Sequence, residues 1–221
     1  MKILLLFCRS LQTIIHQNKT IMKKCFAAIV AMMLAVPSFA QFASGGFELD
    51  KNNVYSGARM GLTLASMSGD LEVSGMKPGL TLAGVIGLRV SSSSPVFLES
   101  GLYYTQRGGK DGDLSMTLKN LEIPIVLKYG IQATDKIALL PFLGPYFSWG
   151  IGGKFKNDKA DYEESSYNFV NHGDMGVKVG CGAEYDMLYL EAGYQFGIAN
   201  IADDKGSIHS NALFINFGVN F

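Results

Sequence analysis

Period-two alternation of apolar and polar residues is the feature that most constrains this chain. In residues 188–198 the even positions read Leu, Leu, Ala, Tyr, Phe, Ile, and the odd positions read Tyr, Glu, Gly, Gln, Gly. Successive side chains of a β-strand point to opposite faces, so this segment is a strand with one apolar face. Residues 121–129 alternate in the same way, over about nine residues, which is the length a tilted strand needs to cross a bilayer.

Segments with this pattern recur along the chain, separated by connections that alternate in length. Short connections at 91–95, 130–135 and 186–187 alternate with longer, mostly polar ones at 68–78, 107–114, 151–174 and 200–207. Short and long connections at opposite ends are typical of an up-and-down antiparallel barrel. We expect strands at about 57–67, 79–90, 96–106, 115–129, 136–150, 175–185, 188–199 and 208–221.

Alternation alone does not say which face lies inside. A soluble eight-stranded barrel of the lipocalin kind would bury the apolar face. Here the polar face carries many glycines and few charges per strand, which suits a narrow barrel interior better than a solvated surface. Aromatic residues on the apolar face also lie near strand ends, as in an interfacial girdle. These girdle residues are Tyr104, Tyr129, Trp149, Tyr185 and Phe221.

These features predict an all-β fold, a transmembrane up-and-down antiparallel β-barrel of about eight strands. The N-terminus adds the pattern of an export signal. Lys23 and Lys24 precede the apolar stretch 26–36, and Ser38-Phe39-Ala40 is a small-x-small cleavage site. A membrane anchor is the alternative, but the apolar stretch is too short to span a bilayer. We expect an upstream extension at 1–21 outside the real precursor, a signal peptide at 22–40 cleaved after Ala40, a short segment at 41–56 and the barrel at 57–221.

Charge and cysteine content limit the function classes. Residues 1–40 hold 5 of the 19 basic residues and no acidic ones, which leaves 14 basic and 19 acidic residues, a formal charge of −5. A net negative chain has no electrostatic footprint for nucleic acid. Only Cys181 lies beyond residue 40, so neither an internal disulfide nor a cysteine-based metal site is expected. We expect no cofactor.

The polar face, if it lines the lumen, points eight charged residues inward. An eight-stranded barrel is just wide enough for side chains to fill, and an unpaired buried charge is very costly. We therefore expect these charges to form an internal network that plugs the barrel, with a narrow ion path as the alternative. The residues are Arg59, Arg89, Glu99, Glu122, Lys128, Lys178, Glu184 and Glu191.

Pro124 does not fit a regular central strand, because a proline removes one ladder donor and a closed barrel has no edge to host it. Pro141 and Pro145 lie at a similar height in the following strand. We expect a β-bulge or a locally weakened ladder between these two strands.

Four stretches resemble the PorT-like outer-membrane β-barrel domain of Gram-negative bacteria, whose members often carry a general porin-family label: GLYYTQRGG (101–109), LEIPIVLKYG (121–130), PFLGPYFSWG (141–150) and INFGVNF (215–221). The resemblance covers essentially all of the chain after the signal peptide. It implies an outer-membrane location and about eight strands, and little about activity. Phe217, Val219 and Phe221 look like the C-terminal sorting signal that the barrel-assembly machinery recognises.

An enzyme that modifies outer-membrane lipids is the less favoured interpretation. His172 and His209 are the only histidines beyond residue 40. Ser210 adjoins His209, but neighbouring strand residues point to opposite faces, so this pair lacks hydrogen-bond reach. We expect no enzyme.

The sequence instead favours a structural or surface-interaction protein whose long loops, such as the mixed-charge segment 151–174, face outside. The expected partners are outer-membrane lipid and lipopolysaccharide, the barrel-assembly machinery and an extracellular ligand that the sequence does not specify. A narrow channel for small solutes or ions is the alternative function.

Overall fold

The computed structural model of the protein describes residues 53–69, 75–157, 159, 162–166, 171–202 and 207–221. The upstream extension, the signal peptide and its cleavage site after Ala40 lie outside the described residues, as does most of the segment 41–56. Among the residues described, no helix is both long and apolar enough to cross a bilayer.

The described chain is built from β-strands. Eight of them form the wall: β1 (Val54–Gly69), β2 (Lys77–Arg89), β3 (Val96–Asp111), β4 (Leu114–Tyr129), β6 (Ile137–Asn157), β8 (Gly173–Tyr185), β9 (Leu188–Gly197) and β10 (Ile208–Asn220). Two short strands, β5 (Ile131–Thr134) and β7 (Tyr162–Glu164), pair with β6.

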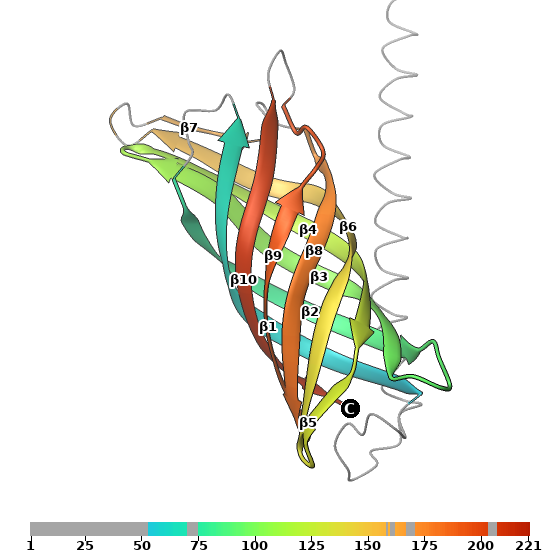
Figure 1. Ribbon diagram of the computed structural model, residues 1–221. Helices are drawn as coiled ribbons and strands as arrows, with labels where there is room; N and C mark the ends of the chain where they lie inside the picture. Colours follow the sequence, from blue (N-terminus) through green and yellow to red (C-terminus); the bar gives the residue numbers. More distant parts are fainter. Residues whose placement is uncertain (1–52, 70–74, 158, 160–161, 167–170, 203–206) are drawn as a thin grey trace, which may run out of the picture. The chain divides into compact units, whose positions relative to one another are not determined.

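The wall strands close into a barrel (Figure 1). Each wall strand pairs antiparallel with the next along the chain, and β1 pairs with β10 from Gly57↔Asn220 to Gly69↔Ile208. Closure gives every wall strand a neighbour on both sides, so that most backbone groups of the wall bond within the sheet. The predicted eight-stranded, up-and-down antiparallel barrel is therefore confirmed.

The two ends of the barrel differ. We call the end with the Asp186-Met187 turn and the C-terminal Phe221 the turn end, and the opposite end the loop end. At the loop end, the expected loop at 107–114 is wrong, because β3 and β4 continue through it and leave only Gly112-Asp113 between them. Gly112 adopts a φ of 53°, in the left-handed region that glycine tolerates best.

β6 likewise runs on to Asn157, so the expected loop at 151–174 begins later than predicted. The physical reason is burial. Met116 and Leu118 on β4 are 0% and 3% exposed, so this part of the sheet covers apolar side chains and is not a solvated loop. Together, β3, β4 and β6 carry a sheet past the rest of the wall, which appears at the upper left of Figure 1.

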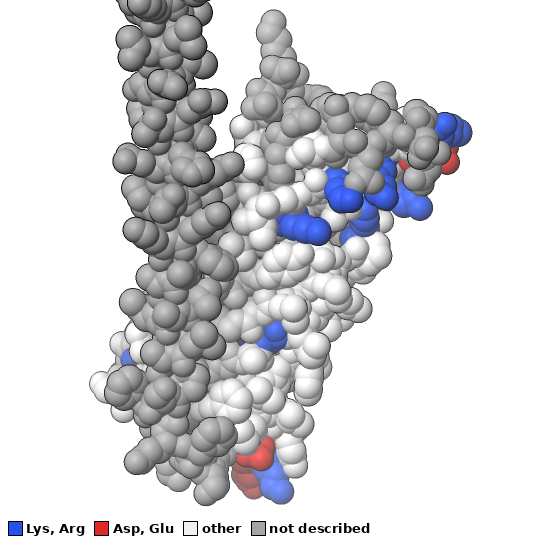
Figure 2. Space-filling model, turned by 180° about the vertical axis from the view of Figure 1, so that it is seen from behind, with Lys and Arg blue, Asp and Glu red and all other residues white. Residues whose placement is uncertain are grey.

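Side chains are distributed inside out compared with a soluble protein. Leu62 on β1 and Ile215 on β10 face each other across the ladder and are 59% and 55% exposed. Thr63 and Asn216, their neighbours along the same strands, are buried. Most of the described surface in Figure 2 is accordingly free of charge, and lysine and arginine gather near the loop end. This is the pattern of a barrel whose outer face contacts lipid.

Pro124 interrupts the ladder locally. β4 and β6 pair in one register on both sides of residues 125–126, but these two residues have no ladder partner. In that register, residue 125 would lie opposite Pro145. Neither proline can donate a ladder hydrogen bond. The Ser100 hydroxyl donates to the Pro124 carbonyl at 2.8 Å and so satisfies that acceptor. The expected weak ladder is present, whereas the register shift lies at 119–120, nearer the loop end.

Candidate functional site

The barrel interior is the candidate functional site, because it holds most of the buried charges of the described chain. Its side chains form five layers between the loop end and the turn end. On β4, from the loop end to the turn end, Met116 and Leu118 belong to an apolar layer, Glu122 to a charged one, Val126 to an apolar one and Lys128 to a second charged one. An aromatic base closes the series.

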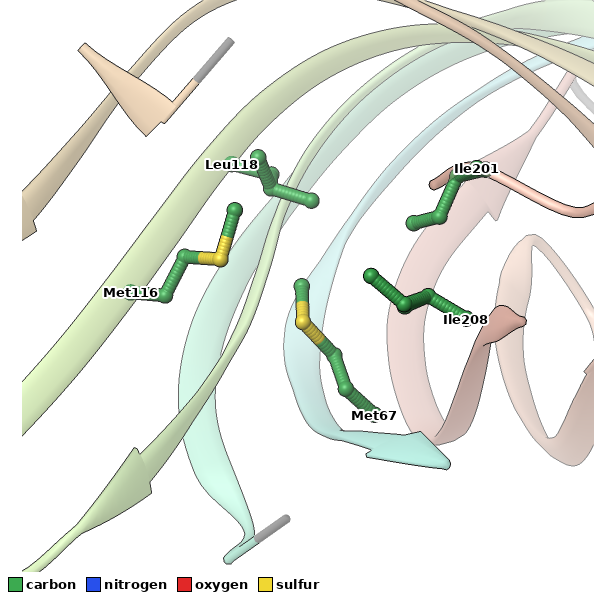
Figure 3. Packing of buried hydrophobic residues seen from close by; sticks show 5 residues of the cluster. All are labelled: Met67, Met116, Leu118, Ile201 and Ile208. Atoms are coloured by element: carbon green, nitrogen blue, oxygen red, sulfur yellow. The ribbon is translucent and has the colours of Figure 1, made fainter. Parts of the chain in front are cut away.

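The mouth cluster is the apolar layer at the loop end (Figure 3). Ile201 reaches it from the connection between β9 and β10, whose backbone is held by hydrogen bonds from Ile201 N to Ile208 O (3.0 Å) and from Asn171 N to Ile201 O (2.8 Å). All its members are at most 6% exposed. The mouth cluster consists of Met67, Met116, Leu118, Ile201 and Ile208.

The upper charge layer lies beneath the mouth cluster and centres on Glu122, which is fully buried. Its carboxylate accepts a hydrogen bond from Arg107 and lies 2.5 Å from Lys178 Nζ. Gln195 Nε2 donates to the same carboxylate at 2.7 Å. Arg107 Nη1 also bonds Asp174 Oδ2 at 3.0 Å. Two cations and two carboxylates therefore neutralise one another away from water.

The phenyl layer separates the two charge layers. Phe142 and Phe214 stack with ring centroids 6.3 Å apart, and Val126 packs with them. Lys128 Nζ lies 5.6 Å from the Phe142 centroid, and Lys178 Nζ lies 5.0 Å from the Phe214 centroid. A lysine from each charge layer thus faces the phenyl layer at cation–π distance.

The lower charge layer centres on Glu99, which is 2% exposed. Glu99 Oε2 accepts from Lys128 Nζ and from Tyr55 OH, each at 2.7 Å, and lies 3.6 Å from Arg59 Nη2. Lys128 Nζ also donates to Tyr189 OH at 2.7 Å. Tyrosine hydroxyls in this layer therefore hydrogen-bond to the charged groups and connect them.

Two further carboxylates belong to the lower charge layer. Glu191 accepts from Tyr189 OH at 3.0 Å and from Asn216 Nδ2 at 2.7 Å. Glu184 accepts from Asn220 Nδ2 at 2.8 Å, and Asn220 Oδ1 in turn accepts from Arg59 Nη2 at 2.5 Å. Asn220 therefore connects Glu184 to Arg59, and the Tyr189 hydroxyl connects Glu191 to Lys128.

The aromatic base closes the turn end of the interior with Tyr55, Phe97, Ala138, Leu140 and Tyr189. Arg89 lies at the rim outside it. Its Nε donates to Ser91 O at 2.9 Å, and its guanidinium lies 5.9 Å from the Phe97 centroid.

The structure brings seven of the eight predicted lumen charges into the two charge layers, and places Arg89 at the rim. The prediction omitted Arg107 and Asp174, which pair with each other in the upper layer. Arg107 was assigned to a loop, although it shares the odd-numbered face of β3 with Glu99. Asp174 shares the even-numbered face of β8 with Lys178. Continuing the period-two pattern past the expected strand ends would have found both.

The expected girdle residues lie on the outer face near the ends of the strands. Tyr129, Tyr185 and Phe221 are 48–49% exposed at the turn end. Toward the loop end, Tyr104 and Trp149 flank Leu121 in one row across β3, β4 and β6. Of the expected sorting residues, Phe217 and Phe221 are each 48% exposed, and Val219 is half-buried on β10.

Both histidines lie at the loop end. His172 Nδ1 lies 2.8 Å from Gly150 O. His209 Nε2 lies 3.0 Å from the Ser207 hydroxyl, and its Nδ1 lies 3.1 Å from Ala199 O. The serine beside His209 is thus Ser207, two residues away on the same face, and not Ser210. Within the described ranges, no group of three or more His, Cys, Asp or Glu side chains could hold a metal ion.

Comparison with known proteins places this geometry in a family. The model of the outer membrane protein beta-barrel domain matches residues 39–203. No curated protein matches the chain. The chain is also similar to solved barrels at low sequence identity. Neisserial surface protein A is 18% identical with a TM-score of 0.48, and the match covers 77% of this chain and 98% of that one.

Two further solved structures are similar over the same part. The attachment invasion locus protein Ail of Yersinia pestis is 14% identical with a TM-score of 0.45, covering 77% of this chain and all of Ail. The outer membrane protein OprG of Pseudomonas aeruginosa is 14% identical with a TM-score of 0.46, covering 76% of this chain and 95% of OprG. The family match spans most of the chain and agrees with the inside-out barrel. The chain therefore belongs to the outer membrane protein beta-barrel domain family, and its location is the cell outer membrane.

Proposed function

We propose that this protein is a structural or surface-interaction protein of the outer membrane, in which a filled barrel supports a contact surface at the loop end. One observation carries the proposal: ion pairs and hydrogen bonds hold the charged groups of both charge layers, which lie between apolar layers, so the interior serves as a rigid support. The loop end, by contrast, carries a sheet of β3, β4, β6 and β7 beyond the rest of the wall. In outer-membrane barrels the long loops face outside, so this sheet would face the environment.

The blocked interior is tested by conductance. Purified protein in planar bilayers is expected to give no steps of porin size, because the mouth cluster and the phenyl layer present apolar side chains on the path of an ion. A narrow channel is the alternative, and reproducible ion-selective steps abolished by Glu122→Gln would support it and contradict the filled interior. The matched control is Lys136→Gln, which removes an exposed charge at the turn end.

We also propose that the protein is not an enzyme. The Ser207–His209 contact is the feature that most resembles a hydrolase pair, but the second ring nitrogen of His209 contacts a backbone carbonyl and not a carboxylate. A base oriented for nucleophilic catalysis is usually held by a third side chain. Incubation with a fluorophosphonate probe is expected to leave the protein unlabelled. Labelling that disappears in Ser207→Ala would establish a reactive serine and overturn this proposal.

The finer family assignment rests on sequence. We infer that the chain belongs to the PorT-like branch, on the stretches 101–109 and 121–130, and that it is exported with cleavage after Ala40 and inserted by the barrel-assembly machinery. Mass spectrometry of the protein from outer membranes should give a chain that begins at Gln41. Deleting Phe221 should lower the amount of inserted barrel, and an unchanged amount would argue against the sorting role.

A further inference from the structure

The loop-end sheet carries a group of lysines on its outward face. Lys110 on β3 lies opposite Ser115 on β4, which lies opposite Lys156 on β6. One step toward the turn end, Thr117 lies opposite Lys154. Lysine and hydroxyl residues thus alternate across β3, β4 and β6, and Glu163 of β7 follows opposite Lys156. We call this surface the lysine face, and it consists of Lys77, Lys110, Ser115, Thr117, Lys119, Lys154 and Lys156.

The lysine face continues the lipid-facing surface. On β4, Lys119 shares the odd-numbered outward face with Leu121 and the apolar residues that follow it. On β6, the odd-numbered residues face outward up to Ile151. The register shift at Ile151 reverses this, so that the even-numbered Lys154 and Lys156 face outward beyond it. The lysines therefore begin directly where the apolar band ends, and they project sideways, as the lipid-facing side chains do.

Lys77 links the lysine face across the sheet. Its ammonium group donates to the hydroxyls of Ser115 and Thr117, both at 2.6 Å. The positive charges of Lys110 and Lys156 repel this ammonium. Several cations and hydroxyl groups within one small area suit an anion with several oxygens, because each oxygen can accept a charge-assisted hydrogen bond while the anion relieves the repulsion.

The lysine face lies on one side of the barrel. At the same end of β1 and β10, the outward residues are neutral, and Asn211 Nδ2 donates to Ser68 Oγ at 3.0 Å. Figure 2 shows the cluster of basic side chains near the loop end on the face seen there. An even ring of lysines would suit a general attraction to an anionic surface, whereas a one-sided group suits discrete ligands.

We propose that the lysine face binds the phosphate groups of phosphorylated glycolipid in the outer leaflet, side-on to the barrel. The proposal rests on the outward orientation of the loop end given under the proposed function. The lysines begin directly where the apolar band ends, which places them at the depth of lipid headgroups and favours lipid over a soluble polyanion. The charges of the lysines and phosphates are complementary, and phosphate matches the mixed ammonium and hydroxyl surface.

The sole tryptophan of the chain supplies a reporter. Trp149 is 54% exposed on the outward face of β6, opposite Leu121 and just below the lysine face. The folded protein in neutral-lipid nanodiscs is titrated with bis-phosphorylated lipid A while Trp149 emission is followed. Saturable binding is expected, and it should weaken as salt is added. Enzymatically dephosphorylated lipid A should bind at least tenfold more weakly, and equal binding of both lipids would overturn the proposal.

A charge-matched pair of variants locates the site. Lys110→Gln combined with Lys156→Gln is expected to weaken lipid A binding on the order of thirtyfold, from about a factor of five per lysine at an anionic surface. Lys136→Gln combined with Arg89→Gln removes two positive charges at the turn end and should leave binding unchanged. Equal losses in both pairs would mean a general charge effect and overturn the site.

Competition identifies the source of the anion. Inorganic phosphate is expected to displace lipid A only in large excess, because it lacks the acyl chains that hold lipid beside the apolar band. Equal potency of free phosphate, or tighter binding of dextran sulfate through the same two lysines, would overturn the lipid assignment. Circular dichroism of each variant establishes that it is folded. Neither result depends on conductance, so the proposed blocked interior and the lysine face can fail separately.

Discussion

The two charge layers differ in how they compensate their buried charges. In the upper layer, Glu122 contacts the cations of both Arg107 and Lys178 directly. In the lower layer, Glu99 contacts Lys128 at 2.7 Å, and Arg59 lies 3.6 Å away. Tyrosine hydroxyls and asparagine amides make the remaining connections there. In the upper layer one carboxylate, Glu122, contacts both cations, and Asp174 contacts only Arg107. The lower layer instead distributes its charge over neutral groups, which tolerate a change in any one member.

The largest effect is expected from Glu122→Gln. The substitution keeps the shape of the side chain but leaves two buried cations with Asp174 as their nearest carboxylate in that layer. Breaking a buried ion pair from one side costs about 3–5 kcal/mol, so the free energy of unfolding should fall by that amount. Urea unfolding in lipid bilayers measures it. A loss below about 1 kcal/mol would remove the distinction between the two layers.

Glu99→Gln is expected to cost less, about 1.5–3 kcal/mol, the usual range for hydrogen bonds to a charged group. The amide oxygen of the new side chain can still accept from Tyr55 and Lys128, and Arg59 keeps its bond to Asn220. The same unfolding measurement applies. If this variant is less stable than Glu122→Gln, the neutral groups of the lower layer do not share the charge as described.

Much of the fold and part of this comparison could be predicted from sequence. The side-chain period of a strand is two, so assigning one apolar face to lipid assigns every alternate residue to the lumen. That argument leads to Glu99, Glu122 and Lys128 without any structure. It gives no distances across the lumen, so it cannot say that Glu122 contacts two cations and Glu99 only one closely.

The remaining differences come from where strands end. Polar composition at 107–114 and 151–174 indicated loops, but a sheet that extends past the bilayer also needs a polar outer face. Local composition cannot tell the two apart, because the inward residues that distinguish them are few. Ile201 illustrates a second limit. It lies in a connection, and only the folded chain shows that it packs against Met67 and Met116 in the mouth cluster.

A smaller effect is expected from Phe142→Leu in the phenyl layer. Leucine keeps much of the volume but loses the stack with Phe214 and the contact with Lys128. Aromatic pairs contribute about 0.5–1.5 kcal/mol beyond their burial, so a loss of about 1 kcal/mol is expected. Phe142→Tyr is the control that keeps the ring. If neither substitution changes the free energy of unfolding in urea, the aromatic contacts of the phenyl layer do not stabilise the two charge layers.

The smallest expected effect is the coupling between the charge layers. Tyr103 lies opposite Glu122 and four residues from Glu99 on β3, which puts the carboxylates about 13 Å apart by strand rise. Two like charges at that distance repel by about 1.3 kcal/mol at an effective dielectric constant of 20. Each single substitution already relieves this repulsion, which the double variant relieves only once. The double variant Glu99→Gln with Glu122→Gln should therefore lose about 1 kcal/mol more than the two single losses together.

The size of this coupling decides whether the layers are separate. If Lys178 or Arg107 turns toward Glu99 once Glu122 is neutral, Glu99 becomes more important in that background. The double variant would then exceed the sum of the single losses by clearly more than the repulsion of about 1 kcal/mol. The two lysines that face the phenyl layer from opposite sides, Lys128 and Lys178, are the groups able to make such an exchange. Repeating the cycle in a Phe142→Leu background tests whether the phenyl layer keeps the two lysines apart. If it does, the smaller side chain should increase the coupling energy.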